Sequence, residues 1–207
     1  MKAESRPHTP YVIGVTGNIA SGKSTVRAML ADLGAATLDA DRVVHLLYEP
    51  GDPVYNAVVQ EFGGRILGQD AAIDRRALGA IVFSDADALQ RLEAIVHPGV
   101  IARERAWIAA QTTPVAVLEA VKLVESGSVE QCDALWVVTT SPAEQRRRLL
   151  RRPGMTEAEA DRRLAAQPSL EAKLARADLV LTNNGTPDEL RAAIAAAWAA
   201  LPIPPVV

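Results

Sequence analysis

The feature of the sequence that most constrains its fold is an octapeptide with glycines, a lysine and a serine at fixed spacing. It consists of Gly17, Asn18, Ile19, Ala20, Ser21, Gly22, Lys23 and Ser24. Residues 11–16 before it are apolar and β-rich, and residues 25–33 after it repeat apolar residues at helical spacing. A glycine-rich loop between a strand and a helix turns backbone N–H groups inward and binds phosphate at the helix N-terminus. The octapeptide therefore predicts a phosphate-binding loop in an α/β protein.

The last two residues of the octapeptide carry specific chemistry. In the pattern G-x-x-x-x-G-K-[ST], we expect Lys23 to reach the β- and γ-phosphates of ATP. We expect the Ser24 hydroxyl to bind the Mg²⁺ ion that bridges those phosphates. A glycine-rich turn with an accidental lysine is the alternative, and the flanking strand and helix argue against it.

Further short β-rich runs, separated by helical patterns, follow the octapeptide. They are residues 36–39, 115–119, 135–140 and 179–182. Parallel neighbours need long crossovers, which are usually helical. The pattern predicts a three-layer α/β fold with a five-stranded parallel sheet.

Two stretches exceed an ordinary crossover, and they define the expected domain organisation. Residues 43–113 are mostly helical in pattern and predict a substrate-binding insertion, and residues 142–177 predict a lid. Residues 1–10 read as a loose tail before a single domain over residues 11–207. Its core is expected in residues 11–42, 114–141 and 178–207, with an alanine-rich helix over residues 192–201.

The charge balance excludes several classes of partner. The chain has 22 basic and 25 acidic residues, so nothing global favours nucleic acid or an anionic membrane. No apolar run approaches the roughly 20 residues that a membrane span needs. Cys132 is the only cysteine, so it forms no internal disulfide, and it has no His or Cys cluster near it that would predict zinc. We expect a cytoplasmic protein that acts on a small molecule, as a monomer or weak homo-oligomer.

The phosphate-binding loop alone does not choose between a kinase, a GTPase switch and a mechanical ATPase. A GTPase would normally carry Asn-Lys-x-Asp, and no lysine here follows an asparagine. A mechanical or nucleic-acid ATPase would be longer and usually basic. A small-molecule kinase remains, with a nucleotide-binding regulatory module as the alternative from another class.

Two aspartates follow the second expected strand. Asp39 and Asp41 stand at its carboxyl end, where ligands bind in open α/β sheets. We expect Asp41 to accept the proton of the attacking hydroxyl, and Asp39 to support it or to contact Mg²⁺ through water. The alternative is that one of them caps the helix that begins near Arg42.

An arginine-rich run marks the expected lid. Arg148 and Arg152 are four residues apart, so they share a helix face and could approach the transferring phosphoryl group together. Arg146, Arg147 and Arg151 are assigned to solvent or to salt bridges. A nucleic-acid patch and a solvated helix face are the alternatives. His97, before Pro98, reads from the residues alone as a packed, hydrogen-bonded histidine.

Several separate motifs now agree with one family. The opening run from Val15 to Thr25 and the run Leu38-Asp39-Ala40-Asp41 are joined by further short motifs in a consistent order. These are Glu49-Pro50-Gly51, Phe62-Gly63, Arg75-Arg76-Ala77-Leu78, Ile81-Val82-Phe83, His97-Pro98, Ala165-Ala166-Gln167 and Asn183-Asn184-Gly185. Over nearly all of residues 11–198 the sequence resembles the dephospho-coenzyme A kinase family.

The resemblance implies an activity and a set of site residues. It implies phosphoryl transfer from ATP to the ribose 3′-hydroxyl of dephospho-CoA, the last step of coenzyme A synthesis, with Asp41 as the base. It makes His97 a substrate-site residue and the 43–96 segment part of the acceptor domain. It places residues 142–164 in the lid and Asn183, Asn184 and Gly185 near the adenine of ATP. The expected ATP site also includes Thr25, next to the octapeptide, and Arg152 of the lid.

The sequence departs from the family pattern at two places. In the run from Glu119 to Glu125, Lys122 replaces an apolar residue. Lys122 could touch a substrate phosphate and Glu119 could lie near Mg²⁺, or the run is a local structural variant. The lid reads Arg152-Pro153-Gly154 where an Arg-Asp pair is common, which leaves its contacts open. Another small-metabolite kinase with the same core is the alternative enzyme.

Overall fold

The computed structural model describes residues 9–167 and 169–203. The chain divides into two compact units, one built from the residues up to Leu38 together with those from Ile108 on, and the other from Asp39–Trp107. The tail prediction for residues 1–8 lies outside the described residues. Thr9 is exposed and Pro10 is buried, directly before the first strand.

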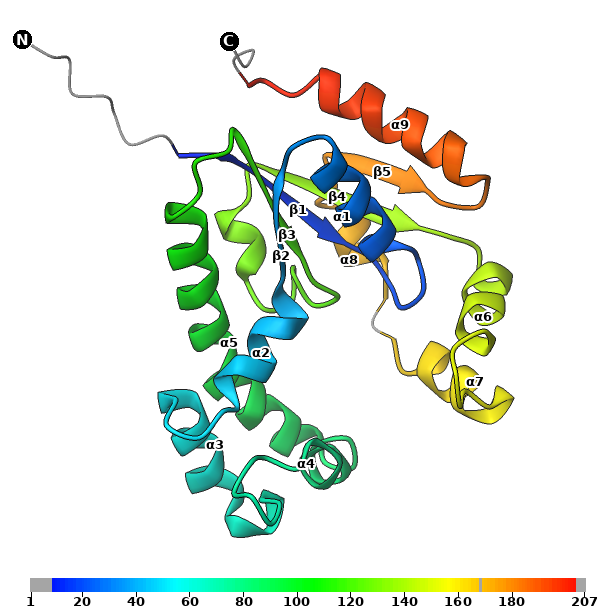
Figure 1. Cartoon of the computed structure of the whole chain (residues 1–207). Coiled ribbons are helices and arrows are strands. Elements are labelled where there is room, and N and C mark those ends of the chain that lie inside the picture. Colours follow the sequence, from blue (N-terminus) through cyan, green and yellow to red (C-terminus); the bar gives the residue numbers. More distant parts are fainter. Residues whose placement is uncertain (1–8, 168, 204–207) are drawn as a thin grey trace, which may run out of the picture. The chain divides into compact units, whose positions relative to one another are not determined.

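A five-stranded sheet forms the centre of the first unit (Figure 1). Its strands are β1 (Tyr11–Thr16), β2 (Ala36–Asp39), β3 (Val115–Glu119), β4 (Ala134–Thr139) and β5 (Leu179–Thr182), in the order β2-β3-β1-β4-β5. β1 pairs in parallel with β3 and β4, β4 pairs with β5, and the whole sheet is parallel. Every predicted strand is present, and only β4 is displaced, by one residue.

The helices of this unit flank the sheet and extend from its edge. They are α1 (Lys23–Asp32), η2 (Ser128–Gln131), α6 (Pro142–Leu150), α7 (Glu157–Ala165), α8 (Glu171–Leu174) and α9 (Pro187–Ala199). α1 and α9 lie against one another on one face (Figure 1). The three-layer α/β fold is therefore confirmed.

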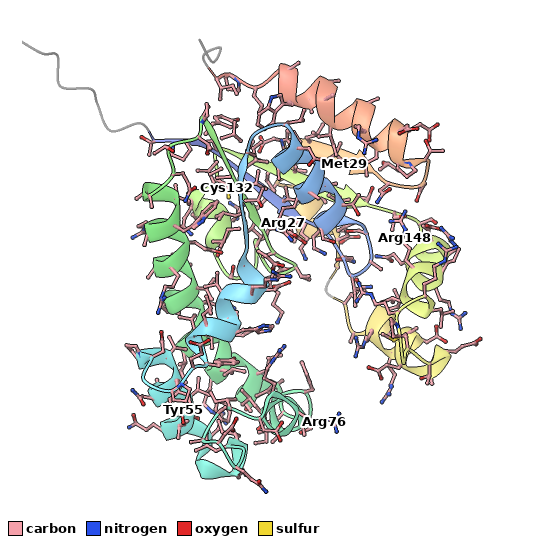
Figure 2. The ribbon with its side chains drawn as sticks, viewed as in Figure 1. Arg27, Met29, Tyr55, Arg76, Cys132 and Arg148 are labelled. Carbon is pink, nitrogen blue, oxygen red and sulfur yellow. The ribbon has the colours of Figure 1, made fainter. Side chains whose placement is uncertain are left out.

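Alternation along β1 divides its side chains between the two faces of the sheet. Ile13 and Val15 are fully buried in a core shared with α1 and α9. That core includes Val26, Met29 and Leu30 of α1, Leu190 and Ile194 of α9, and Val117, Trp136, Val138 and Leu181 of the neighbouring strands. Gly14 faces the other way, where an added Cβ would lie 2.6 Å from Leu123 Cδ2 and 2.8 Å from Cys132 Sγ. Figure 2 labels Met29, which lies on α1, and Cys132, which follows η2.

The second unit is helical, as predicted for residues 43–113. It contains α2 (Ala40–Leu47), α3 (Pro53–Phe62), η1 (Gly64–Ile66), α4 (Arg75–Val82) and most of α5 (Ala86–Ala109). Aspartates cap three of these helices: Asp39, Asp52 and Asp74 accept from backbone N–H groups of α2, α3 and α4. The Tyr55 hydroxyl donates to the Ala71 carbonyl over 2.6 Å and ties α3 to the following loop (Figure 2).

The C-terminal helix begins earlier than its alanine run predicts. α9 begins at Pro187, where Thr186 and Glu189 form a capping box, and ends at Ala199. The alanine run marked only the apolar part of the helix, because the first turn is polar and is set by the cap. The helix prediction for residues 192–201 was therefore too short at its start.

Candidate functional site

The phosphate-binding loop connects β1 to α1 at the carboxyl edge of the sheet (Figure 1). Two glycines in the loop have no tolerated replacement. A Cβ on Gly17 would lie 2.2 Å from the Val138 carbonyl oxygen, and a Cβ on Gly22 would lie 2.1 Å from Asn183 Nδ2. Gly22 also has a left-handed φ of 102° directly before the first helical residue. The backbone is therefore closely packed at both positions.

The side chain of Lys23, the first residue of α1, folds back over the preceding loop. Its side chain is buried, and Nζ donates to the Asn18 carbonyl over 3.2 Å. The Ser21 N–H donates to the same carbonyl, also over 3.2 Å. The ammonium group is thus held inside the curve of the loop, where a phosphate would meet it.

Two polar side-chain atoms in the loop are buried without a hydrogen bond to any described residue. They are Asn18 Oδ1 and Ser21 Oγ, and Ser21 is only 1% exposed. A buried polar group with no partner is costly in a native structure. Both atoms lie in the segment predicted to bind a nucleotide, so a polar ligand there fits the structure.

Side chains from α6 and from the turn after β5 hold the other side of the loop. Arg148 Nη1 donates to the carbonyls of Ala20 (3.4 Å) and Ser21 (3.1 Å), and Nη2 donates to the Asn183 carbonyl over 2.9 Å (Figure 2). Asn183 Nδ2 donates to the Ser21 carbonyl over 2.8 Å. The sequence predicted Arg148 near the transferring phosphoryl group, and the family resemblance implied Asn183 near the adenine. In the structure both side chains contact the loop backbone.

The turn after β5 is ordered by its own contacts. Asn184 Oδ1 accepts from Thr140 Oγ1 and from the Ser141 N–H, each over 2.8 Å. A Cβ on Gly185 would lie 2.0 Å from Glu189 Oε2, so the capping box of α9 requires a glycine here. Arg152, by contrast, is exposed after the end of α6.

Sequence reasoning gave no role to two glutamines that contact the same loop. Gln145 Nε2 donates to the Ile19 carbonyl over 3.0 Å, and Gln167 Oε1 accepts from the Ile19 N–H over 2.7 Å. Gln167 appeared only within the Ala165-Ala166-Gln167 motif, and Gln145 stood inside the arginine-rich run. Nothing in their spacing indicated that both would reach one loop residue.

Ion pairs join the two helices of the expected lid. Arg146 Nε lies 2.8 Å from Asp161 Oδ1, and Arg146 Nη2 lies 3.0 Å from Glu157 Oε2. The hydrogen bond from Arg146 lowers the pKa of Asp161. Arg147, followed by Arg148, lowers the pKa of Glu144 to about 2. Arg146 and Arg147 are thus in the salt bridges to which the sequence assigned them.

Glu119 ends β3 in a buried position. It is 7% exposed, and its Oε2 lies 2.6 Å from Arg27 Nε of α1. Lys122 is exposed in the turn that follows β3. Among the described residues, no cluster of three or more His, Cys, Asp or Glu side chains is arranged to hold a metal ion.

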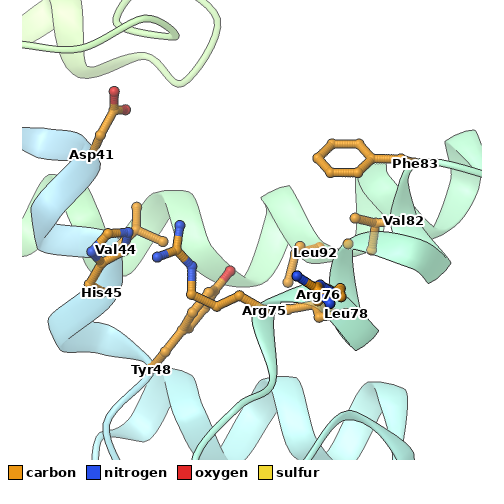
Figure 3. Close-up of a pocket in the computed structure, with 11 residues that line it drawn as sticks. Asp41, Val44, His45, Tyr48, Arg75, Arg76, Leu78, Val82, Phe83 and Leu92 are labelled. Atoms are coloured by element: carbon orange, nitrogen blue, oxygen red, sulfur yellow. The ribbon is translucent and has the colours of Figure 1, made fainter. Parts of the chain in front are cut away.

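The second unit contains a pocket of about 580 Å³, shown in Figure 3. Asp41 lies at one end of it and Phe83 at the other, and both side chains are exposed. The rest of the lining comes from α2, α4 and α5 and combines apolar, cationic and aromatic groups: Val44, His45, Tyr48, Arg75, Arg76, Leu78, Gly79, Val82 and Leu92.

The polar groups of this pocket favour an anionic ligand. Arg75 extends across it toward α2, beside Tyr48 (Figure 3). Burial raises the pKa of the Tyr48 phenol to about 12, against a smaller lowering effect of Arg75. The phenol is therefore a neutral hydrogen-bond donor at physiological pH.

Asp39, at the start of α2, accepts from the Arg42 N–H over 3.3 Å as the helix cap. His97 is half-buried in α5.

No helix in the described part of the chain is long and apolar enough to cross a membrane.

Comparisons with known proteins agree with one another. The family model for dephospho-CoA kinase matches residues 11–189. Dephospho-CoA kinase of Symbiobacterium thermophilum is 47% identical over 192 residues, which cover 91% of this chain and 80% of that protein. The enzyme of Geobacter sulfurreducens is 46% identical over 191 residues, 91% of this chain and 97% of that protein.

A solved structure gives the same result. Dephospho-CoA kinase from Campylobacter jejuni superposes with a TM-score of 0.66 at 27% identity, covering 91% of this chain and 95% of that chain. Sequence and structure thus identify one family, whose members catalyse the ATP-dependent final step of coenzyme A biosynthesis. The chain belongs to the dephospho-CoA kinase family.

Proposed function

We propose that this chain transfers the γ-phosphoryl group of ATP to the ribose 3′-hydroxyl of dephospho-CoA, with Asp41 as the general base. The observation that carries the assignment of the base is the position of Asp41 at the end of a pocket with cationic and aromatic walls. A carboxylate there suits a hydroxyl acceptor whose other parts include a purine and a diphosphate. The phosphate-binding loop of the other unit supplies the donor site.

The donor site is assigned to the octapeptide, Thr25 and the turn after β5. Lys23 is buried beside the loop backbone and would exchange its contact with the Asn18 carbonyl for the β- and γ-phosphates. Asn18 Oδ1 and Ser21 Oγ fit water or nucleotide groups as partners. Asn183, Asn184 and Gly185 are proposed to lie near the adenine.

The donor set at the start of α1 fits Mg²⁺. Ser24 is exposed there, and the hard oxygen of its hydroxyl is a ligand that Mg²⁺ accepts. Mg²⁺ usually keeps several waters and binds through one or two protein groups and substrate phosphates, so no acidic cluster is required. When bound, the ion would neutralise charge on the phosphates. Glu119 and, through water, Asp39 are proposed as outer groups.

The acceptor site is assigned to the pocket of the second unit. Arg75 and Arg76 would face the diphosphate of dephospho-CoA, since guanidinium groups bind phosphate oxygens in pairs. The neutral Tyr48 phenol would donate to an oxygen of the same group. Phe83, 84% exposed, offers an open aromatic face for the adenine. His97, Lys122 and Asp39 stay predicted substrate-site residues.

The proposed reaction is a single displacement. The Asp41 carboxylate takes the proton of the 3′-hydroxyl as that oxygen attacks the γ-phosphorus. The bond between the γ-phosphorus and the β,γ-bridging oxygen breaks, and ADP leaves with the electron pair. Lys23 stabilises the charge that develops on the phosphates. The products are coenzyme A and ADP, with the proton initially on Asp41.

The lid and its arginines complete the proposal. We assign residues 142–177 to a lid and residues 43–113 to the acceptor insertion of one kinase domain. Arg148 is proposed to act near the phosphates, and this role requires it to exchange some of its contacts with loop carbonyls. Arg152 is proposed to reach the nucleotide from its exposed position. We also propose a cytoplasmic monomer or weak homo-oligomer that needs neither nucleic acid nor membrane.

Coupled ADP release tests the proposal. Wild type and Asp41→Asn are assayed with Mg²⁺-ATP and dephospho-CoA, with adenosine, AMP and shikimate as other acceptors. We expect turnover on dephospho-CoA alone and a kcat about 10²–10⁴-fold lower in Asp41→Asn, because the base is lost. ATP binding should persist in the variant. Turnover on another acceptor would contradict the acceptor, and full activity of Asp41→Asn would contradict the base.

A further inference from the structure

Three consecutive carbonyl groups of the phosphate-binding loop accept hydrogen bonds from side chains outside it. The Ile19 carbonyl accepts from Gln145, the Ala20 carbonyl from Arg148, and the Ser21 carbonyl from both Arg148 and Asn183. Gln145 and Arg148 lie three residues apart on α6, so one face of this helix contacts the loop. These hydrogen bonds therefore fix the orientation of three peptide groups of the loop.

The direction of a carbonyl fixes the direction of the next N–H group. In a planar trans peptide, the C=O of one residue and the N–H of the next point opposite ways. The bond from Gln145 to the Ile19 carbonyl therefore turns the Ala20 N–H away from α6. The bonds to the Ser21 carbonyl do the same for the Gly22 N–H. An anion-binding nest is made of N–H groups that converge in this way.

Ile19 is the residue held most completely. Its carbonyl accepts from Gln145 over 3.0 Å, and its N–H donates to Gln167 over 2.7 Å. Gln145 is 8% exposed, so its amide makes this bond away from bulk water. The two glutamines come from different places in the lid, one in α6 and one two residues after the end of α7. The peptide groups before and after Ile19 are thus each held by a hydrogen bond with a glutamine of the expected lid.

The next residue shows why such fixing is needed. Ala20 has a φ of 58°, in the left-handed region that residues with a Cβ avoid. A strained backbone at a functional site persists only when its surroundings over-determine it. Hydrogen bonds to Ile19 before it and to the carbonyls of Ala20 and Ser21 hold Ala20 in this conformation.

We propose that Gln145 and Gln167 are positioning residues for ATP, acting through the peptide groups of Ile19. They hold the loop in the conformation whose N–H groups receive the phosphates, and they do not themselves need to touch the nucleotide. The inference rests on the proposed ATP site. It also makes the ends of the lid part of the donor site.

The first test is ATP affinity in Gln145→Leu and Gln167→Leu, with Gln60→Leu as the control. Gln60 is an exposed amide of α3 in the other unit. We expect each of the two variants to raise the Kd and KM for ATP at least about fivefold, as for the loss of one hydrogen bond. The KM for dephospho-CoA should stay within twofold, and Gln60→Leu should resemble wild type. A merely structural role would affect both substrates.

The two glutamate variants give a sharper comparison, because the two amides act in opposite senses. Toward the loop, Gln167 accepts a hydrogen bond, so Gln167→Glu keeps an acceptor for the Ile19 N–H and loses only the bond from Nε2 to the Leu164 carbonyl of α7. Gln145 donates, so Gln145→Glu loses the donor and sets a carboxylate oxygen against the Ile19 carbonyl. Both add one negative charge near the loop, so their difference reports the hydrogen bonds. We expect Gln145→Glu to weaken ATP binding at least fivefold more than Gln167→Glu.

Ala20→Gly provides an independent check on the same loop. Glycine adopts the left-handed region without penalty, so the loop would depend less on its side-chain contacts. The effect of Gln145→Leu on the Kd for ATP should therefore be smaller in the Ala20→Gly background. Equal ATP affinities of wild type and both leucine variants, or equal effects of the two glutamate variants, would overturn the positioning role. Unchanged ATP binding in Lys23→Ala would instead contradict the proposed ATP site.

Discussion

Lys173 is a charged residue with no exposed surface. Its Nζ lies 2.7 Å from Glu125 Oε1, and the carboxylate partner is 32% exposed at the side chain. The pair joins α8 to the turn after β3, two elements that the sequence did not connect. The sequence has only four lysines, but composition does not reveal the partner of Lys173.

Because Lys173 is fully buried and Glu125 is partly exposed, we expect the loss of either partner to affect stability differently. Glu125→Gln leaves a buried ammonium group without its counter-charge, and we expect it to lower the free energy of unfolding by about 3 kcal/mol. Lys173→Met leaves a carboxylate that water already reaches, so we expect a loss of only about 1 kcal/mol. Urea unfolding measures both. The control is Glu130→Gln, whose pair with Arg176 is exposed, and a larger loss in Lys173→Met than in Glu125→Gln would contradict the argument.

Phe83 is the most exposed of the large apolar side chains in the described part of the chain, at 84%. If it stacks on the acceptor's adenine, Phe83→Ala should raise the KM for dephospho-CoA about 5- to 10-fold, as expected for losing one base–aromatic contact. Phe83→Trp should keep most of the affinity. The KM for ATP should not change in either variant.

Leu46→Ala is the matched control for Phe83. Leu46 is also exposed, at 52%, and lies in the same unit but does not line the pocket. Steady-state kinetics with varied dephospho-CoA would distinguish the two positions. An unchanged KM in Phe83→Ala would remove Phe83 from the acceptor site.

At the scale of elements, α6 and α7 form a charged hairpin whose properties depend on pH. Hydrogen bonds from Arg147 and then Arg148 lower the pKa of Glu144 from its ordinary 4.5 to about 2. A carboxyl whose folded pKa is lowered stabilises the fold above its unfolded pKa. That contribution is lost as the pH falls from about 4.5 toward 2. Because its main partner, Arg147, is exposed, the contribution is small, and a direct titration is the better measurement.

Carbon-detected NMR of the Glu144 carboxyl tests this prediction. We expect a titration midpoint near 2 in wild type. Arg147→Ala should raise that midpoint markedly, because it removes the largest cause of the shift. Arg151→Ala, at the exposed end of the same helix, should leave it unchanged. A wild-type midpoint near 4.5 would show that the ion pairs do not persist in solution.

The elements also show which signals in the sequence are decisive. The strands were predicted within one residue, because buried parallel strands are short apolar runs bounded by turns. Thr156 caps α7 by accepting from the Glu159 N–H, and a threonine followed three residues later by a glutamate is a helix-start pattern that the sequence shows. The start of α9 was missed, because the alanine run outweighed the capping box at Thr186. Apolar patterns locate elements well, and caps locate their ends.

At the scale of the whole molecule, the fold and family followed from motifs, but the contacts around the loop did not. The octapeptide predicted a phosphate-binding site because its glycines and its lysine lie close together in the chain. Gln145 and Gln167 are 126 and 148 residues from Ile19, so only the folded chain brings them together. The residues that line the pocket are likewise spread from Asp41 to Leu92. Motifs formed by nearby residues can be recognised in the sequence, whereas the side chains that contact them can be identified only from the tertiary structure.

The most direct test of the account is the position of the phosphate on the product. Dephospho-CoA is incubated with the wild-type protein and Mg²⁺-ATP, and the product is examined by ³¹P NMR and by ³¹P–¹H correlation. We predict one new phosphomonoester resonance coupled to the ribose 3′ proton, with the diphosphate resonances of the acceptor retained. A monoester coupled to the 2′ proton or to the pantetheine chain, or no new monoester while ATP is hydrolysed, would contradict the account.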